Sequence, residues 1–423
     1  MIHTVLTFIT QVKPDQVGNL RKILAEIDQN PEKNGYVSFR ALLRVHFASF
    51  VLHEPPQPSE YGPYLVFENN FDGALEDYLP DLYSQAASGL HQIYSCCFDY
   101  SVSSATDRQG VLDYLRAHAV YPNAYHVGNT GRSVERILQE QALRVDLETQ
   151  CDGLVEGGQA SSVAGVLGSL QNFVHYDPRW SRLPSVGPRE TLEQKFVAWF
   201  KLIFVVLLAA LLSPLWFVPA VILVAVLRYK ESTDSVQSDA ADAANVLKLL
   251  EKENYTTVVQ NHMASITIVK PGWLRRKTLW LVLWAVNLLA RANATHGTLS
   301  GIPSIHFAHW SMIDQGRRLL FLSNFDGSWE NYLDDFIDKA AHGLTGVWSN
   351  TVNFPRTYFL IFGGATDGPR FKAIARDSQI VTNAWYSAYQ NLTVQDIDNS
   401  SSIRESLLKP LDADGAAELV ERL

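Results

Sequence analysis

The 423-residue sequence has only three cysteines and no excess of positive charge. Two of the cysteines, Cys96 and Cys97, are adjacent, so a disulfide framework is excluded and a reducing compartment is indicated. Thirty-five basic residues stand against 44 acidic ones, which gives a net charge of −9. Because a general nucleic-acid-binding protein normally carries a basic surface, nucleic acid is excluded as a partner.

Recognisable catalytic and metal-binding motifs are also missing. The sequence contains no HExxH, CxxC, Walker loop, GxSxG or Rossmann fingerprint, and we therefore predict no metal site. The N-terminal residues MIHTVLTFITQVKPDQ lack the basic-then-apolar order of a secretory signal peptide.

Charge is absent altogether from residues 202–227, LIFVVLLAALLSPLWFVPAVILVAVL. About 20 apolar residues suffice to cross the hydrocarbon core, and buried helices of soluble proteins seldom have such long apolar runs. This run predicts a membrane segment.

Two prolines, Pro214 and Pro219, lie near the middle of the run, and each removes a helical hydrogen bond. The segment is therefore either a single kinked span or a hairpin that returns to its starting side. Basic residues flank both ends (Lys195 and Lys201, then Arg228 and Lys230). Because the positive-inside rule requires an asymmetry, this balance favours the hairpin.

The sequence also repeats itself. VHFASF (45–50) matches IHFAHW (305–310), and LVFENNFDGALEDYLPD (65–81) matches LLFLSNFDGSWENYLDD (319–335). AASGLHQIYS (86–95) matches AAHGLTGVWS (340–349), and YPNAYH (121–126) matches VTNAWY (381–386). The order is kept throughout, so the chain is a tandem duplication.

Each copy has the β-α-β-β-α-β pattern of a ferredoxin-like unit. In the first copy we expect strands at 4–10, 39–52, 64–68, 92–102 and 123–127, and helices at 15–27, 73–88 and 108–118. Two antiparallel sheets can shield one face of each by packing together, and this requires both copies to lie on one side of the membrane. The repeat therefore independently favours the hairpin.

One helix of the second copy, residues 273–292, differs from its ordinary amphipathic counterpart. It contains the run LWLVLWAVNLLA together with Trp273, Trp280 and Trp284, and residues 275–277 are Arg-Arg-Lys. This composition predicts an interfacial membrane helix, with a buried core helix as the alternative.

The predicted organisation follows from these features. It comprises repeat 1 (1–145), a linker with poor core potential (146–195), the membrane segment (196–230), a polar linker with a short helix (231–260), repeat 2 (261–408) and a C-terminal tail (409–423). The fold class is α+β, with tandem duplicated ferredoxin-like repeats and an inserted membrane hairpin.

The NFDG motif occurs in both copies, at a junction between strand and helix. We expect Asp72 and Asp326 to cap the following helices and Gly73 and Gly327 to provide the turn. The alternative is an Asp directed into a cavity between the sheets, with Glu76 or Glu330 one turn later. The shared structural or pocket positions are His46, Asn70, Asp72, Gly73, Glu76, Asn324, Asp326, Gly327 and Glu330.

Histidines supply the remaining candidates. His46 and His306 occupy the same strand position, whereas His309 and His342 replace Ser49 and Ser88 of the first copy. A copy-specific polar group is expected of a specialised site. Asp326, His306 and His309 are therefore catalytic candidates, and His342 is a candidate haem ligand.

The tandem copies resemble the dimeric α/β-barrel superfamily, which includes dye-decolourising peroxidases and chlorite dismutases. More closely, SGIPSIHFAHW, FLSNFDGSWENYLDDFIDKA and TNAWYSAYQNLTV, within 261–408, resemble a group of largely uncharacterised bacterial membrane proteins. The peroxidases have a GxxDG motif; here NNFDG and SNFDG keep the Asp-Gly and lose the first glycine.

These features predict a membrane-anchored duplicated α/β barrel, with its soluble domains on the cytoplasmic side. It would bind an apolar small molecule, a membrane lipid or a protein partner at the membrane surface. The alternative is a haem peroxidase-like or monooxygenase-like oxidoreductase that acts on apolar substrates.

Overall fold

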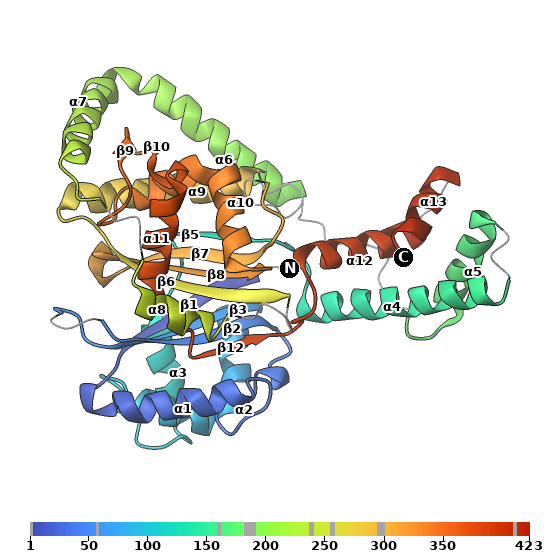
Figure 1. The fold of residues 1–423 in the computed structure, drawn as a ribbon. Helices are drawn as coiled ribbons and strands as arrows, with labels where there is room; N and C mark the ends of the chain where they lie inside the picture. Colours follow the sequence, from blue (N-terminus) through green and yellow to red (C-terminus); the bar gives the residue numbers. More distant parts are fainter. Residues whose placement is uncertain are drawn as a thin grey trace.

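The computed structural model describes residues 3–55, 59–158, 162–181, 192–236, 241–253, 259–293, 301–408 and 413–423. The protein is α+β and contains two five-stranded antiparallel sheets packed face to face (Figure 1). Helices α1, α2 and α3 cover the outer face of one sheet, and α9, α10 and α11 cover the other.

The first half contributes β1 (His3–Gln11), η1 (Pro14–Gln16), α1 (Val17–Gln29), η2 (Phe39–Ala41), β2 (Val45–His53), β3 (Tyr64–Asp72), α2 (Leu75–Ser95), α3 (Arg108–Ala117), β4 (Ala119–Val120), β5 (Ala124–Val127) and α4 (Val134–Glu156). The second half contributes β6 (Gln260–Ile268), α9 (Trp273–Asn293), β7 (Ile305–Ile313), η3 (Asp314–Gly316), β8 (Arg318–Asp326), α10 (Trp329–Trp348), β9 (Thr357–Tyr358), β10 (Phe362–Gly363), η4 (Gly364–Thr366), α11 (Gly368–Ser378), β11 (Gln379–Ile380), β12 (Ala384–Ser387), α12 (Val394–Leu407) and α13 (Ala413–Glu421). Between the halves lie α5 (Val163–Tyr176), α6 (Leu192–Leu211), α7 (Ser213–Ser232) and α8 (Ala243–Leu250).

The two halves exchange their last strands. The first sheet has the order β12-β2-β3-β1-β4 and the second has the order β11-β6-β8-β7-β5. In Figure 1, β12 lies in red beside the blue strands of the first half. We expected 123–127 to complete its own copy, but β5 pairs with β7 of the other half instead.

The same asparagine fastens each exchanged strand. Asn383 accepts a hydrogen bond from the Leu52 backbone N–H at its Oδ1 (2.6 Å), and Asn123 accepts one from Met312 N–H (2.8 Å). Each asparagine also donates its own backbone N–H to the partner strand, at Phe50 and Trp310 respectively. The NA dipeptide that both copies contain is therefore a strand-exchange anchor.

The strand expected at 92–102 is wrong. Helix α2 continues to Ser95, and only Cys97 forms an isolated bridge, to Val12. The apolar residues at the end of this helix lie on one helical face, since Leu90, Ile93 and Tyr94 are all buried in the first core. The buried residues of this segment therefore recur with the period of a helix and not with the alternation of a strand.

The segment following the first sheet also packs better than expected. Helices α4 and α5 form a buried cluster with α12 and α13, which extends to one side of the sheets (Figure 1). Leu143 and Leu147 of α4 meet Leu170 of α5 and Ile403 of α12. Glu140 is buried beneath them, where it pairs with Arg136 and Arg404. The expectation of poor core potential in this region is therefore wrong.

Candidate functional site

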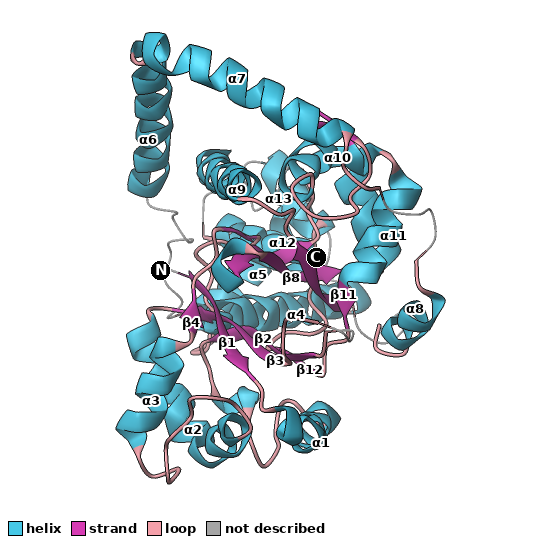
Figure 2. Ribbon diagram, turned by 90° about the vertical axis from the view of Figure 1, so that its left-hand side faces the viewer, coloured by secondary structure: helices cyan, strands magenta, loops and turns pink. Residues whose placement is uncertain are grey.

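An apolar helical arch, formed by α6 and α7, projects from the body. The two helices meet at Leu212, and their junction lies away from both sheets (Figure 2). Helix α7 is long and apolar enough to cross a membrane, and residues 199–211 form a shorter apolar helix. On α7, the large apolar side chains between Leu215 and Val226 are exposed.

The junction between the two helices is closed by local hydrogen bonds. Pro214 lies in the first turn of α7, where a missing N–H costs nothing. The Trp216 indole N–H donates to the Ala209 carbonyl at 2.8 Å, and Leu215 N–H donates to the Leu212 carbonyl at 2.9 Å. An unpaired backbone group in lipid costs several kcal/mol, and these bonds therefore suit an apolar setting.

Both legs of the arch return to the second half. Helix α6 lies alongside α9, and the end of α7 contacts β9. Just beyond α7, Asp234 accepts hydrogen bonds from the Lys270 ammonium (2.7 Å) and from Arg275 (2.8 Å). Arg275 is buried, so this residue, which the sequence suggested as a headgroup contact, instead fastens the exit of the arch.

Helix α9 presents tryptophans outward beside the arch. Trp273, Trp280 and Trp284 are all exposed, whereas Leu279 and Leu283 on the other side of the helix are fully buried in the second core. Helix α9 is therefore apolar on two sides. One side packs into the second core, as the core-helix alternative expected, and the other exposes tryptophans, which are enriched at membrane interfaces.

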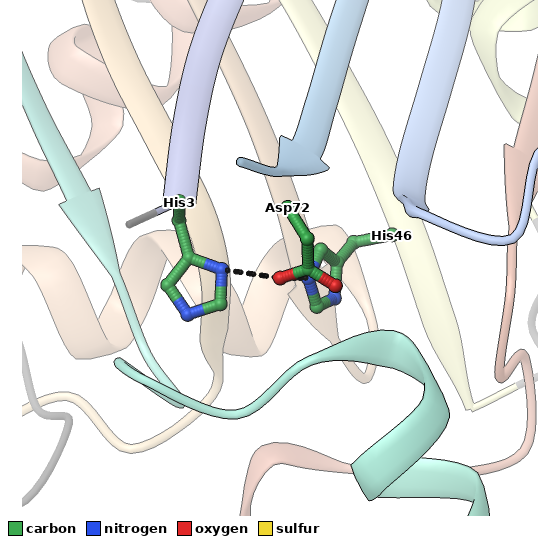
Figure 3. Close-up of side chains that lie close together, drawn as sticks. All are labelled: His3, His46 and Asp72. Carbon is green, nitrogen blue, oxygen red and sulfur yellow. Dashed lines mark hydrogen bonds and ion pairs between the residues drawn. The ribbon is translucent and has the colours of Figure 1, made fainter. Parts of the chain in front are cut away.

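A different group of polar side chains lies between the sheets. His3, His46 and Asp72 come from β1, β2 and β3 and converge on one point (Figure 3). His46 Nε2 lies 3.1 Å from Asp72 Oδ1, and His3 Nδ1 lies 3.2 Å from the same oxygen, off the line of an ideal hydrogen bond. His3 has no equivalent in the repeated motifs, so no signal in the sequence marks it.

These three side chains offer one ligand atom each within 4.8 Å, which is close enough to surround a metal ion. The surrounding donors fix their protons, however. The Gly131 backbone N–H donates to His3 Nε2 at 2.8 Å, so neutral His3 carries its proton on Nδ1, toward Asp72. His46 donates from Nε2 to Asp72 and can accept from the Tyr389 hydroxyl at Nδ1 (2.8 Å). The donors and acceptors of these three side chains are therefore occupied by one another and by their neighbours, and this arrangement needs no cation.

Asp72 also caps a helix, although not the one expected. Its Oδ2 accepts the Val134 backbone N–H at 2.9 Å, at the start of α4, whereas the N-cap of the following helix α2 is Ala74. Asp326 likewise accepts Val394 N–H at 2.8 Å, at the start of α12, and Ser328 caps α10. Each aspartate therefore accepts a hydrogen bond at the start of a helix, as predicted, but that helix is not the one that directly follows it.

The second half builds the matching arrangement with a glutamine. His306 Nε2 lies 2.7 Å from Asp326 Oδ1, and Gln260 occupies the strand position opposite Asp326 that His3 occupies opposite Asp72. Gln260 donates to the carbonyls of Tyr389 and Leu392. We call the two arrangements the His3 clasp (His3, His46, Asp72) and the Gln260 clasp (Gln260, His306, Asp326).

Bulges bring both histidines into the clasps. The register of β2 shifts between Val45 and Phe47, and that of β7 shifts between Ile305 and Phe307. Simple alternation places a histidine and the next phenylalanine on opposite faces, but the bulges allow both to face the other sheet. His46 thus lies 5.3 Å from the ring of Phe307, and His306 lies 5.1 Å from that of Phe47.

A third cluster centres on Glu68, which is fully buried between the sheets. Its carboxylate accepts hydrogen bonds from Asn70 (2.9 Å) and Asn324 (3.0 Å), the two asparagines of the NFDG motifs. His262 Nε2 lies 2.9 Å away, and His309 Nδ1 lies 3.8 Å away. The cluster is asymmetric, because one half supplies the acid and the other supplies both histidines.

The charges in this cluster are strongly perturbed. Burial acts to raise the pKa of Glu68, but the attraction of His262, its hydrogen bond and His309 outweigh burial and lower that pKa to about 2. Burial lowers the pKa of His309 to about 4, against the smaller opposing effect of Glu68. His262 also lines a polar pocket of about 210 Å³, together with Thr382 and Trp385.

The remaining candidates lie apart from these clusters. Glu76 and Glu330 form ion pairs with Arg116 and Arg376 on the outer helices. His342 is exposed on α10, where its ring meets Phe362. Gly73 and Gly327 have φ angles of +91° and +80°, as their turn role requires.

The described residues between the sheets do not fit a haem. Two side-chain clusters fill that space, one around Phe47 and Phe307 and the other around Val66 and Leu322. His309 is fully buried, and its Nε2 lies 3.1 Å from the Thr7 hydroxyl. A cavity under α10, lined by Phe321, Tyr332 and Trp348, measures about 30 Å³, far below the roughly 300–1,000 Å³ of small-molecule sites.

No protein-family model matches the chain, and no curated protein matches it either.

Proposed function

We propose that the protein is a monotopic membrane protein whose α6–α7 arch enters the bilayer as a hairpin. In this proposal the arch anchors a double-sheet body at the cytoplasmic surface. The body presents a binding surface for a membrane lipid, an apolar small molecule or a protein partner. Because the inter-sheet space is filled, binding is assigned to the membrane-proximal surface and not to the interior.

The observation that carries the proposal is the exposed apolar surface of the arch. Soluble monomers rarely expose contiguous apolar patches larger than a few hundred Å². Along α7 the exposed side chains include Leu215, Phe217, Val221 and Ile222. Burying one such side chain stabilises a protein by roughly 1.5–3 kcal/mol, so an arch left in water would forfeit a large favourable term.

A hairpin accounts for the arch better than spanning helices do. Two full spans need about 40 apolar residues, whereas the uncharged run has 26 (202–227). One span would place the ends of the run on opposite sides, but both legs contact the same half of the body. The junction at Leu212 is itself uncharged, which suits a tip that stays within the hydrocarbon.

We also propose that the body is a duplicated ferredoxin-like unit of the dimeric α/β-barrel type. Supporting this, the two strand orders match when β1, β2, β3, β4 and β5 are set against β6, β7, β8, β11 and β12. The equivalent asparagines Asn123 and Asn383 fasten the exchanged strands, and the two clasps use the same Asp-to-helix contact.

Cysteine labelling tests the topology. Asp152→Cys and Ser235→Cys lie before and after the arch, in a Cys151→Ser background that leaves only the two buried native cysteines. We expect a membrane-impermeant maleimide to label both sites in inside-out vesicles and neither in sealed cells. Leu215→Cys, near the junction, should resist labelling from either side until detergent is added.

Opposite accessibility of the two sites would overturn the hairpin. Labelling of all three sites without any membrane fraction would overturn membrane attachment itself.

A further inference from the structure

The second half contains an apolar tip that the first half lacks. Ser95 corresponds to Ser349 and Ala105 to Ala365, so the connection after α10 is six residues longer than the one after α2. The longer connection forms the β9–β10 hairpin, whose residues 357–364 (TYFLIFGG) contain no charge. Tyr358, Phe359, Ile361 and Phe362 are 47%, 55%, 45% and 50% exposed.

The tip is held in an unusual backbone conformation. Phe359 and Leu360 have φ angles of +54° and +65°, in the left-handed region that side chains other than glycine seldom adopt. Such strain persists only where the surroundings impose it, and it concentrates at functional segments. The conformation directs four large apolar side chains into solvent instead of into the core beneath them.

One carboxylate imposes this conformation. Glu231 accepts the backbone N–H groups of Phe359 (2.9 Å) and Leu360 (2.7 Å) and the Thr357 hydroxyl (2.7 Å). It is 4% exposed, and Arg228, one turn earlier, contacts it at 3.3 Å. The guanidinium of Arg228 also lies 5.0 Å from the ring centre of Tyr358.

Glu231 belongs to the last turn of α7, so the tip is tied to the leg of the arch. Figure 1 shows β9 and β10 beside α7 and on the same side of the body as α6 and α9. The arch, the tryptophans of α9 and the tip are all apolar and exposed, and the first half has no counterpart to the tip or to the apolar run of α9. All three lie on the same side of the body (Figure 1).

We propose that the Tyr358–Phe362 tip inserts into the same bilayer surface as the arch, at the boundary between headgroups and acyl chains. This inference rests on the proposed membrane attachment. The tip has the composition of such a contact, with phenylalanine and isoleucine for the acyl chains and a tyrosine beside an arginine at the headgroup level. The Glu231 contact sets the depth of the tip relative to α7.

Fluorescent labelling at single cysteines tests the inference in vesicles of phosphatidylcholine and phosphatidylglycerol. An environment-sensitive dye is attached at Phe359→Cys in the full chain, again in the Cys151→Ser background. Leu215→Cys serves as the control for the arch. Leu43→Cys, which replaces a 78% exposed side chain of the first half, serves as the aqueous control.

We expect dye at position 359 to be quenched more by nitroxides near the headgroup than by nitroxides near the acyl-chain end. Dye at position 215 should show the opposite order, and dye at position 43 should respond only to aqueous iodide. Quenching at 215 without lipid quenching at 359 overturns the tip while leaving the arch intact. Shielding of 359 from both iodide and nitroxide lipids indicates a protein partner and also overturns it. Failure at 215 overturns the proposed attachment.

A second variant separates the tip from the overall fold. Glu231→Gln removes the charge that holds the two backbone N–H groups, and we expect lipid quenching at 359 to fall while quenching at 215 is unchanged. Glu418→Gln, on the exposed surface of α13, is the matched control and should change neither. Unchanged quenching at 359 in Glu231→Gln would show that this carboxylate does not position the tip.

Discussion

The His3 clasp should be a major contributor to stability, and Asp72→Ala is the sharpest way to test it. Asp72 is buried, and its carboxylate meets His46, His3 and the first N–H of α4. Burial acts to raise the pKa of Asp72, but the close contact of His3 and the hydrogen bond from His46 hold that pKa well below its usual value. At neutral pH the group is therefore a carboxylate, and all of its contacts are charge-assisted.

The size of the effect follows from those contacts. Loss of a helix cap costs about 1 kcal/mol. Leaving the buried His46 N–H without an acceptor costs about 1–3 kcal/mol more, and the contact with His3 is lost in addition. We expect Asp72→Ala to lower the free energy of unfolding by about 3–5 kcal/mol, which is the sum of these three losses.

The second half provides a matched control for this prediction. Because Gln260 occupies the position of His3 opposite Asp326, His3→Gln should be tolerated and should cost less than about 1 kcal/mol, the worth of one hydrogen bond. Asp326→Ala should cost about as much as Asp72→Ala. Urea unfolding in detergent, followed by tryptophan fluorescence, measures all three variants.

Two results would refute the reasoning. If Asp72→Ala lowers the free energy of unfolding by less than 1 kcal/mol, the clasp does not hold the start of α4 against the first sheet. A loss for His3→Gln as large as that for Asp72→Ala would mean that the two clasps are not equivalent.

Three further predictions follow from the clusters and the strand exchange. The pKa of His309 is about 4 in the folded protein against 6.5 when unfolded, so the unfolded chain binds more protons, and His309 should cost up to about 3 kcal/mol of stability as pH drops from 6.5 to 4. His309→Gln should weaken the slope of unfolding free energy against pH in this range, and the burial-lowered pKa values of His46 and His53 account for what remains. Glu68 titrates at about 2 against 4.5, so its contribution is present above pH 4.5 and is lost between 4.5 and 2, and Glu68→Gln should weaken the pH dependence in this lower window only. A fragment of residues 1–181 lacks β12, and light scattering should find it dimeric, with each β5 in the place of β12; a stable folded monomer would contradict the exchange.

Much of the fold could be predicted from the sequence because local signals specify it. Strand alternation and helical periodicity located β1, β3 and α3, and the NFDG glycines marked turns that require positive φ. The two prolines predicted a break in the apolar run, and the helices do part at Leu212, just before Pro214, whereas Pro219 lies inside α7 without ending it. These features depend on residues within a few positions of one another.

The site could not be predicted in the same way, since its contacts join residues far apart in the sequence. Asp72 caps a helix that begins 62 residues later, and Glu68 meets His262 from the other half. Alternation along β7 places His306 and His309 on opposite faces, and only the bulge at Ile305–Phe307 brings both between the sheets. His3 belongs to no local motif and to none of the repeated segments, so its role depends only on contacts made in the fold.

Three differences between the halves stand out against the contacts that they share. The clasps and the strand-exchange anchors are nearly the same in both halves, which is expected of contacts that fix each exchanged strand and the chain segment that follows it. The second half differs in the apolar run of α9, in the β9–β10 tip and in the two histidines that face Glu68. The first two differences lie beside the arch, and the third is buried between the sheets. The test is to replace residues 350–364 by the shorter connection of the first half. If the tip serves attachment to the membrane, this replacement should weaken vesicle binding. It should leave the free energy of unfolding unchanged, because the clasps are intact. Vesicle flotation and urea unfolding of the same variant would separate these effects, and a joint loss of both would show that the tip is a part of the core.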